Sequence, residues 1–360
     1  MPIQSNSLFS LGTEVFVGTP STRYLMNPDF ESTETRLFSG AETRSPFLDP
    51  VAHSTSLAAA PAGSPFSLVD NMTLAGVAVP GVGLSLVREA DGDDSMFAPG
   101  MDGRVGLGPR SAFAQARVIA VTPVNITTGA DEGQLGKNIE LLSAIPAATS
   151  GETDVALPIT AGESGWRIRA RVTISDLPIS SALQDIVIDP ISRDFEVPNA
   201  VMDQLVARLP GAFDDGMRRL WLPCDAEGLF TVPPDALFVL PGGADLYTLA
   251  LFTEPEERMI KTNLRTGGRV CSTAIAVNVA RPSAWRLNPL MAMGGRAVFL
   301  DSRTRRVIVR TGYGSPELPT IAPIAVPLIP VFSDYVTRTA GNITELRFNP
   351  VPAGRTGVAR

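Results

Sequence analysis

Proline and glycine interrupt this chain at short intervals, which limits it to short elements of secondary structure. The 360 residues include 31 prolines and 32 glycines, scattered along the sequence. Between them recur apolar runs with alternating faces, among them residues 14–17, 167–174 and 306–310. Short alternating runs bounded by turn residues are typical of β-strands. The sequence therefore predicts an all-β protein with a few short helices.

One segment has the periodicity of an amphipathic helix instead. Residues 199–209 follow Pro198, which can start a helix, and precede Pro210 and Gly211, which stop one. The apolar residues that fall on one face of this predicted helix are Val201, Met202, Leu205, Val206 and Leu209.

Charge and side-chain inventory exclude several classes of function. A net charge of -7 argues against binding to a nucleic-acid backbone. No apolar run approaches the roughly 20 residues needed to span a bilayer, and residues 1–7 lack the features of a secretory signal. His53 is the single histidine and there are two cysteines, which excludes multi-histidine and cysteine-rich metal sites. We expect no metal and no other cofactor.

Two aspartates occupy matching contexts in the two halves of the chain. Asp29 and Asp189 each follow an apolar, strand-like run and enter a short polar turn. One interpretation is that they are halves of a duplicated site and meet in the folded protein. The other is that each aspartate only caps a turn, which is a common use of this residue.

Further segments, in the same order along the chain, resemble the pepsin-like aspartic protease family over roughly residues 13–313. Gly18-Thr19-Pro20 stands before Asp29, and Met101 to Pro109 resembles the segment that supports the first site of that family. In the second half the similar pieces are the strand from Trp166 to Ile174, Val197-Pro198 with the helix, the flanks of Cys224 and Cys271, and the hairpin around Val298 to Ser302.

This resemblance implies a bilobal acid-protease fold with a cleft between two β-barrel-like lobes. Residues 1–150 would form the N-terminal lobe with the connection between lobes, and residues 151–313 the C-terminal lobe. The stretch from about residue 123 to residue 165 is expected to be the loop-rich connection between the lobes. Residues 314–360 would be a Pro-rich, apolar extension packed on the body as an extended strap, since prolines at that density exclude a helix and any central strand.

The catalytic turns themselves depart from the family pattern. Each family aspartate opens an Asp-Thr-Gly turn, which allows two carboxylates to share one proton. Here Phe30 and Pro190 stand at the threonine positions, and Glu31 and Ile191 at the glycine positions. Ser32 and Ser192 remain where a hydroxyl orients each carboxylate in that family. We therefore do not expect peptide hydrolysis.

The residues expected at the site follow from this comparison. Asp29, Asp189 and Glu31 are the candidate acid–base groups. If Arg193 faces either aspartate, both carboxylates stay ionised and cannot share a proton. The expected lining of the cleft is Phe30, Ser32, Pro190, Ile191, Ser192 and Arg193.

The resemblance also implies a disulfide between Cys224 and Cys271. The alternative is two buried free thiols, as in a cytosolic chain. Three glycosylation triplets, at Asn71, Asn125 and Asn342, join the cysteine pair in indicating a secreted or lumenal protein.

Three functions compete. The first is a pseudo-protease whose cleft binds a ligand or a protein or peptide partner. The second is a repurposed enzyme that performs cyclase- or isomerase-type acid–base catalysis on a small hydrophobic molecule. The third is an atypical aspartic endopeptidase. Salt-bridged, inert carboxylates favour the first function, whereas a desolvated carboxylate in an apolar pocket favours the second.

Overall fold

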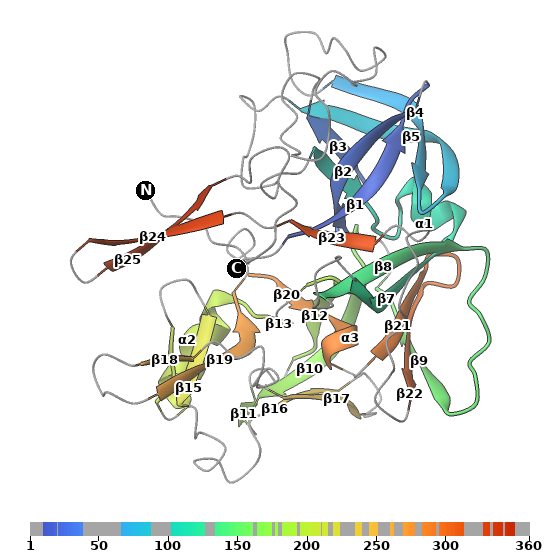
Figure 1. The fold of residues 1–360 in the computed structure, drawn as a ribbon. Helices are drawn as coiled ribbons and strands as arrows, with labels where there is room; N and C mark the ends of the chain where they lie inside the picture. The colour runs from blue at the N-terminus through green and yellow to red at the C-terminus, as the bar shows by residue number, and fades with distance from the viewer. Residues whose placement is uncertain are drawn as a thin grey trace.

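The computed structural model confirms the expected all-β class (Figure 1). In the part of the chain that it describes, strands predominate and the helices are α1 (Ala112–Ala116), α2 (Asn199–Arg208) and α3 (Pro289–Ala292). None of these helices is long and apolar enough to cross a membrane. The described residues are 10–19, 21–38, 66–87, 102–126, 134–160, 164–174, 177–178, 182–192, 195–209, 211–214, 219–223, 235–239, 245–250, 260–262, 269–277, 283–292, 295–312, 327–331, 334–340 and 343–349.

The first six strands form a closed ring, seen in blue and cyan at the top of Figure 1. Going around it, the order is β1-β2-β6-β3-β5-β4, and β4 pairs again with β1. Alternate residues of a strand point to opposite faces, so one face of each strand fills the interior of the ring. The strands are β1 (Ser10–Val17), β2 (Thr22–Asp29), β3 (Thr35–Phe38), β4 (Phe66–Leu74), β5 (Val77–Val87) and β6 (Gly103–Gly106).

The second half of the chain repeats this order of strands. The series β10-β12-β20-β13-β19-β15 has the same succession of antiparallel and parallel pairings as β1-β2-β6-β3-β5-β4. In this half, β10 also pairs with β16, and β16 pairs with β17. The strands are β10 (Arg167–Ile174), β11 (Leu177–Pro178), β12 (Gln184–Ile188), β13 (Phe195–Glu196), β14 (Phe213–Asp214), β15 (Arg219–Pro223), β16 (Asp235–Val239), β17 (Asp245–Ala250), β18 (Ile260–Thr262), β19 (Arg269–Ala276) and β20 (Trp285–Leu287).

A third set of strands draws on distant parts of the sequence. The order β8-β7-β21-β22-β9 joins strands from before β10 to strands from after β20. The expectation of a loop-rich connection at 123–165 is therefore wrong. That stretch has few large apolar residues, but Ile139, Leu141 and Leu157 are buried and suffice for two strands with one covered face. The strands are β7 (Val118–Ile126), β8 (Gln134–Leu142), β9 (Glu152–Pro158), β21 (Gly295–Asp301) and β22 (Arg306–Gly312).

The C-terminal extension enters this sheet, contrary to the expectation that its prolines exclude a central strand. β23 (Pro327–Val331) lies between β1 and β8. It meets its two neighbours over different parts of its length: residues 327–328 pair with β8, and residues 329–331 pair with β1. Each of its prolines is therefore paired on one side only, and a proline is barred from a sheet only where its missing N–H would have to donate to a neighbouring strand. β24 (Asp334–Ala340) and β25 (Ile343–Asn349) form a separate hairpin.

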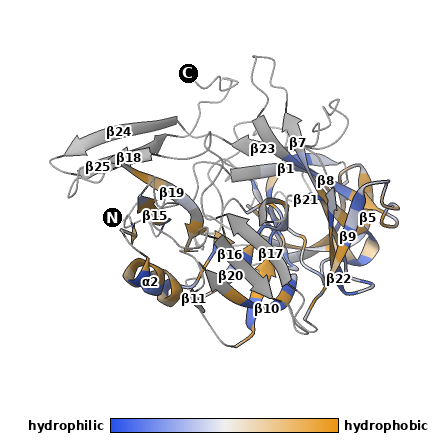
Figure 2. Cartoon of the chain, turned by 90° about the horizontal axis from the view of Figure 1, so that it is seen from below, coloured by the Kyte–Doolittle hydropathy of each residue, from blue (hydrophilic) through white to orange (hydrophobic). Residues whose placement is uncertain are grey.

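The predicted helix is confirmed as α2. Pro198 occupies its N-cap position, and Val201, Met202 and Leu205 are buried, as the periodicity requires. Hydrophobic and hydrophilic residues alternate along it in Figure 2. The first turn of an α-helix has unsatisfied backbone N–H groups, so the missing N–H of proline does no harm just before it.

A buried hydrogen bond links the two halves of the chain. The indole N–H of Trp166, just before β10, donates to the carbonyl oxygen of Leu107, just after β6, at 2.8 Å. Both residues are fully buried. Gly108 lies at the same junction, and a Cβ there would come within 2.3 Å of the carbonyl oxygen of Ser164 and 2.8 Å of that of Ser32. The backbones thus approach too closely for any side chain at residue 108.

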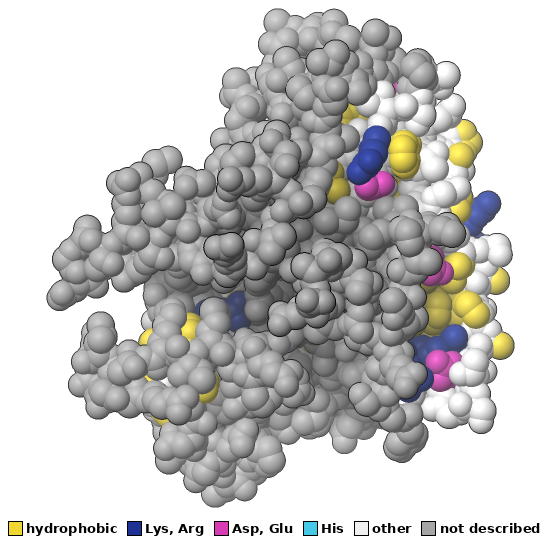
Figure 3. Space-filling view, in the orientation of Figure 1, with side chains coloured by type: hydrophobic (Ala, Val, Ile, Leu, Met, Phe, Trp, Pro, Cys, Tyr) yellow, Lys and Arg dark blue, Asp and Glu magenta, His cyan; other side chains and the backbone are white. Residues whose placement is uncertain are grey.

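The described surface visible in Figure 3 carries mixed charge. Lys or Arg side chains lie beside Asp or Glu side chains there, with hydrophobic side chains scattered between them. Charges of opposite sign in such close mixture do not create the single-sign field that steers polyanions to a protein.

The junction at Gly108 gives a test of the fold. We expect Gly108→Ala to lower the free energy of unfolding by about 1–3 kcal/mol, because the added methyl group overpacks a backbone crossing. Gly83→Ala is the matched control, since a Cβ at Gly83 meets no atom within 4 Å. That change should be neutral or stabilise by about 0.5 kcal/mol. Urea denaturation measures both, and equal effects would contradict the close approach at Gly108.

Candidate functional site

Asp29 ends β2 and caps the turn that follows. Its Oδ1 accepts hydrogen bonds from the backbone N–H groups of Glu31 and Ser32 at 2.9 and 3.1 Å. Such bonds from a carboxylate to the backbone two and three residues onward are the usual way in which an aspartate stabilises a turn. This geometry agrees with the turn-capping interpretation of the sequence.

The other oxygen of Asp29 is bound by an arginine. Arg104 of β6 donates from Nη1 to Oδ2 of Asp29 at 2.9 Å, and the two side chains are 21% and 11% exposed. β6 runs parallel to β2, with Arg104 opposite Asn27. Because residues two apart share a face of the sheet, Arg104 lies on the same side as Asp29 and reaches it along the strand.

Asp189 follows β12 in the corresponding position. Its Oδ1 accepts a hydrogen bond from the backbone N–H of Ile191 at 3.1 Å, and its carbonyl oxygen accepts one from the N–H of Ser192 at 3.2 Å. Its Oδ2 lies 3.6 Å from Nε of Arg286. Asp189 therefore also caps its own turn and faces a guanidinium.

Arg286 of β20 is the centre of the site. Its Nε donates to Oε1 of Glu31 at 2.9 Å, and its Nη2 bonds the same oxygen. Its Nη1 donates to Oε1 of Glu196 at 3.1 Å. One guanidinium thus binds carboxylates from both halves of the chain: Glu31 from the turn after β2, and Asp189 and Glu196 from the second half.

The two arginines occupy equivalent places in the repeated strand order. Arg104 lies opposite Asn27 in the parallel pair β2–β6, and Arg286 lies opposite Val187 in the parallel pair β12–β20. In each half, the arginine is therefore in register with the residue two positions before the aspartate. Each half therefore contains an aspartate-capped turn with an arginine on the adjacent parallel strand.

Burial and mutual repulsion act on the carboxyl groups. Burial raises the pKa of Asp189 to about 6, against the lowering effects of Arg286 and the N–H of Ile191. The charges of Glu31 and Asp29 add to the rise, so the three carboxyl groups are close enough to interact. Burial lowers the pKa of Arg286, but Glu196, Asp189 and Glu31 raise it by more. Arg286 therefore stays charged.

The remaining residues predicted for the site lie in different environments. Glu31 has 3% of its side chain exposed and lies in the ion cluster, the group of carboxylates around Arg286. Phe30 is buried in the hydrophobic core, Pro190 is buried, and Ile191 packs against the core from a partly exposed position. Arg193 lies outside the described residues.

The role expected for the Ser32 hydroxyl is wrong. Its Oγ accepts from the backbone N–H of Glu34 at 3.1 Å and donates to the Glu34 carbonyl oxygen at 3.3 Å. Only the backbone N–H of Ser32 reaches Asp29. In the second half, Asn288 donates from Nδ2 to the carbonyl oxygen of Ser192 at 2.6 Å and so holds that turn.

Sequence reasoning missed Arg104, Arg286 and Glu196. A local signal was present, because an arginine stands before an apolar residue in both Gly103–Gly106 and Trp285–Leu287, but its distance from the aspartate differs between the two halves. Glu196 then lies opposite Arg286 in β13, as Arg36 lies opposite Arg104 in β3.

Only one cysteine of the predicted disulfide, Cys271, lies among the described residues. Cys271 is buried on β19, opposite Leu222 of β15. Cys224 follows the end of β15 and lies outside the described residues, as does His53. Within the described residues, no group of three or more His, Cys, Asp or Glu side chains has a geometry suited to a metal ion.

Comparison with known proteins adds no further assignment. No protein-family model matches the sequence, and a search of curated proteins finds no match.

The ion cluster predicts a large effect for loss of Arg286. Arg286→Met should lower the free energy of unfolding by about 3–5 kcal/mol, because three carboxylates lose their common cation. Arg169→Met is the matched control, since Arg169 pairs with Asp185 while both side chains are 54% exposed. Its effect should be less than about 1 kcal/mol. Equal effects in urea denaturation would show that Arg286 is not buried among these carboxylates.

The raised pKa of Asp189 predicts an unusual dependence of protein stability on pH. Since the folded-state pKa is raised to about 6 from 3.8, the folded protein binds this proton more tightly than the unfolded chain does. The contribution of Asp189 is thus most favourable below pH 4 and is lost as pH rises through 6. Asp189→Asn, which resembles the protonated form, should stabilise the protein at pH 7 by about 1–3 kcal/mol.

Urea denaturation at pH 4, 5.5 and 7 tests this pH dependence. The advantage of Asp189→Asn over wild type should shrink towards pH 4. Asp185→Asn, at a half-exposed position on β12, the strand that precedes Asp189, is the control and should change stability by less than about 0.5 kcal/mol. An advantage that grows on acidification would mean that the pKa of Asp189 is lowered.

Proposed function

We propose that this chain is a degenerate pepsin-like protein that lacks peptidase activity and uses the region between its two halves to bind a ligand or partner. Two observations support the relationship. The strand order of the first half recurs in the second, and each series presents an aspartate-capped turn at the same position. In addition, the carboxyl groups of Asp29, Glu31 and Asp189 interact electrostatically.

The observation that carries the proposal is the binding of Glu31, Asp189 and Glu196 by Arg286. Peptide hydrolysis by two aspartates requires that they share one proton, so that one acts as base and the other as acid. Here Asp29 has its own cation in Arg104. A carboxylate next to an arginine is stabilised in its charged form. Asp29 and Asp189 therefore each lie beside a different guanidinium group.

The turns support the same conclusion. Glu31 fills the place at which the family has a glycine, and its carboxylate bridges to Arg286. The Ser32 hydroxyl is occupied by the backbone of Glu34 and does not orient Asp29. A region with four carboxyl groups and two guanidinium groups suits a ligand or peptide that offers hydrogen-bond donors, with Ile191 as an apolar contact.

A second candidate function rests on Asp189. A carboxyl group with a pKa of about 6 is matched to general acid–base catalysis near neutral pH. This fits the alternative of a cyclisation or isomerisation of a small hydrophobic molecule in the same region. Loss of turnover in Asp189→Asn with retained ligand binding would separate this alternative from a binding protein.

Proteolysis is tested directly with acid-denatured casein between pH 3 and 7. We expect peptide release by wild type to equal that of the double variant Asp29→Asn/Asp189→Asn, and pepstatin to have no effect, because each aspartate caps its own turn and contacts its own arginine. Pepsin under the same conditions is the positive control. Cleavage that pepstatin blocks and Asp29→Asn abolishes would restore the endopeptidase hypothesis and overturn the proposal.

A further inference from the structure

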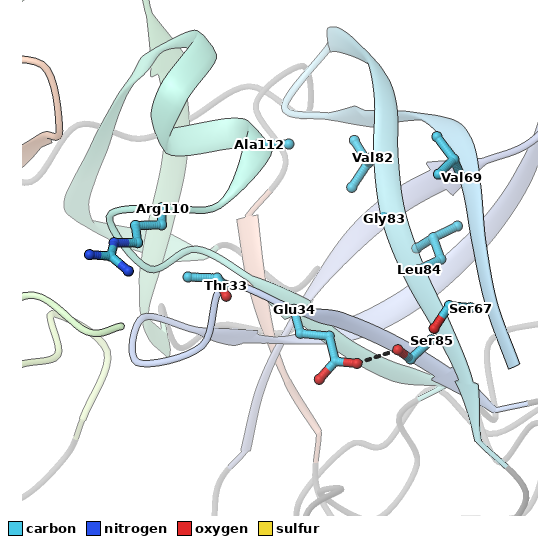
Figure 4. Close-up of a pocket in the computed structure, with 10 residues that line it drawn as sticks. All are labelled: Thr33, Glu34, Ser67, Val69, Val82, Gly83, Leu84, Ser85, Arg110 and Ala112. Carbon is cyan, nitrogen blue, oxygen red and sulfur yellow. Dashed lines mark hydrogen bonds between the residues drawn. The ribbon is translucent and has the colours of Figure 1, made fainter. Parts of the chain in front are cut away.

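A separate pocket lies beside the turn that carries Glu31. It has a volume of about 460 Å³ and is open to solvent between the β4–β5 hairpin, the residues that follow the turn, and the start of α1 (Figure 4). That volume lies within the range of small-molecule sites in proteins. The residues of the ion cluster, Asp29, Glu31, Asp189 and Arg286, do not line it.

One wall of the pocket is apolar and partly uncovered. Val69 is 71% exposed and is the only exposed large hydrophobic side chain in the described part of the chain. Val82 and Leu84 of β5 also border the pocket but are only 3% and 1% exposed, since their side chains belong to the hydrophobic core. Between them, a Cβ at Gly83 would meet no atom within 4 Å, so the space over the strand is free. An apolar group placed there would cover Val69 and the bare backbone.

The carboxylate at the base of the pocket is already satisfied. Figure 4 shows Glu34 and Ser85 pointing toward each other, joined by a hydrogen bond. Arg36 donates to Oε2 of Glu34 from Nε at 3.0 Å and from Nη2 at 2.8 Å. Burial alone would raise the pKa of Glu34, but these hydrogen bonds and the charge of Arg36 lower it. Glu34 therefore stays ionised, with its own cation beside it.

Arg110 is the uncompensated charge of the pocket. Its side chain is exposed, and it makes no hydrogen bond or ion pair within the described part of the chain. It lies at the end of the pocket remote from Val69, with its guanidinium turned outward (Figure 4). Since Glu34 is paired with Arg36, the lining as a whole favours an anion.

We propose that this pocket binds a small amphipathic anion, with a hydrophobic body against Val69 and the backbone of Gly83, and a carboxylate at Arg110. A guanidinium binds a carboxylate through two parallel N–H groups, which fixes the polar end of such a ligand. An amphipathic cation would be repelled by Arg110 and would find Glu34 occupied. A neutral molecule would use the apolar wall alone.

The probes for this proposal are decanoate, decylamine and 1-decanol, titrated below the concentrations at which they form micelles. Amide chemical shifts of the ¹⁵N-labelled full chain report the binding. Decanoate should bind saturably, and about tenfold more tightly than either analogue, which corresponds to one charge-assisted contact. Shifts should concentrate in β4, β5 and the start of α1.

Two variants of the pocket and two controls locate the binding. Gly83→Val fills the free space and should abolish saturable binding. Arg110→Gln should weaken decanoate binding about tenfold and make it equal to 1-decanol. Arg117→Gln removes another exposed arginine, outside the pocket, and should bind decanoate like wild type. Asp189→Asn should also do so, which separates this pocket from the region of the proposed function.

Several results would overturn the proposal. These are the absence of saturable decanoate binding to wild type, undiminished binding to Gly83→Val, or a preference for decylamine. Val69→Asp provides a second test that does not depend on how Gly83→Val folds, because residue 69 is exposed. It should weaken decanoate binding by placing a negative charge on the apolar wall, and unchanged affinity would count against the pocket.

Discussion

The contact of Arg286 with three carboxylates is the interaction on which the site depends. Removing charges from water is costly unless they are paired and hydrogen-bonded. Glu31 is almost completely covered, and Asp189 and Glu196 are mostly covered. The planar guanidinium can serve several carboxylates at once because its N–H groups point in fixed, different directions. Its contacts reach both halves of the chain and so fix the turn after β2 against β12, β13 and β20.

The two aspartates are equivalent in position but differ in chemistry. Asp29 accepts two backbone N–H bonds and one from Arg104. Asp189 accepts one backbone N–H and lies farther from a guanidinium that also serves Glu31 and Glu196. Hydrogen bonds to a carboxylate favour its charged form, and burial without them favours the neutral form. Asp189 has few such hydrogen bonds, and burial raises its pKa to about 6.

Local patterns in the sequence were enough for the elements, but not for their partners. Helix α2 and strand β10 follow from periodicity and from the prolines and glycines around them, because those signals act within a few residues. Arg286 could not be assigned to Glu31 in the same way, since the two residues meet only through the register of β12 with β20. The sequence named Arg193 as the cation instead.

Other expectations failed because a residue preference was applied without its geometry. Prolines bar a strand from a sheet interior only when their missing N–H faces a neighbour, and β23 divides its pairing between β8 and β1. A low content of large apolar residues likewise did not prevent β8 and β9 from forming, since a strand with one covered face needs few of them. In both cases, tertiary contacts rather than local residue preferences determine whether a strand forms.

The pairing of β1 with β23 has a consequence for biosynthesis. Residues 10–12 leave the ribosome long before their partners, residues 329–331. The ring of β1 to β6 can close earlier, whereas the edge of β1 that pairs with β23 stays open until β23 has been made. An open strand edge is a template for mispairing with other chains. Shielding of this edge of β1 during synthesis, by a chaperone or by rapid translation, would therefore govern the yield of native protein.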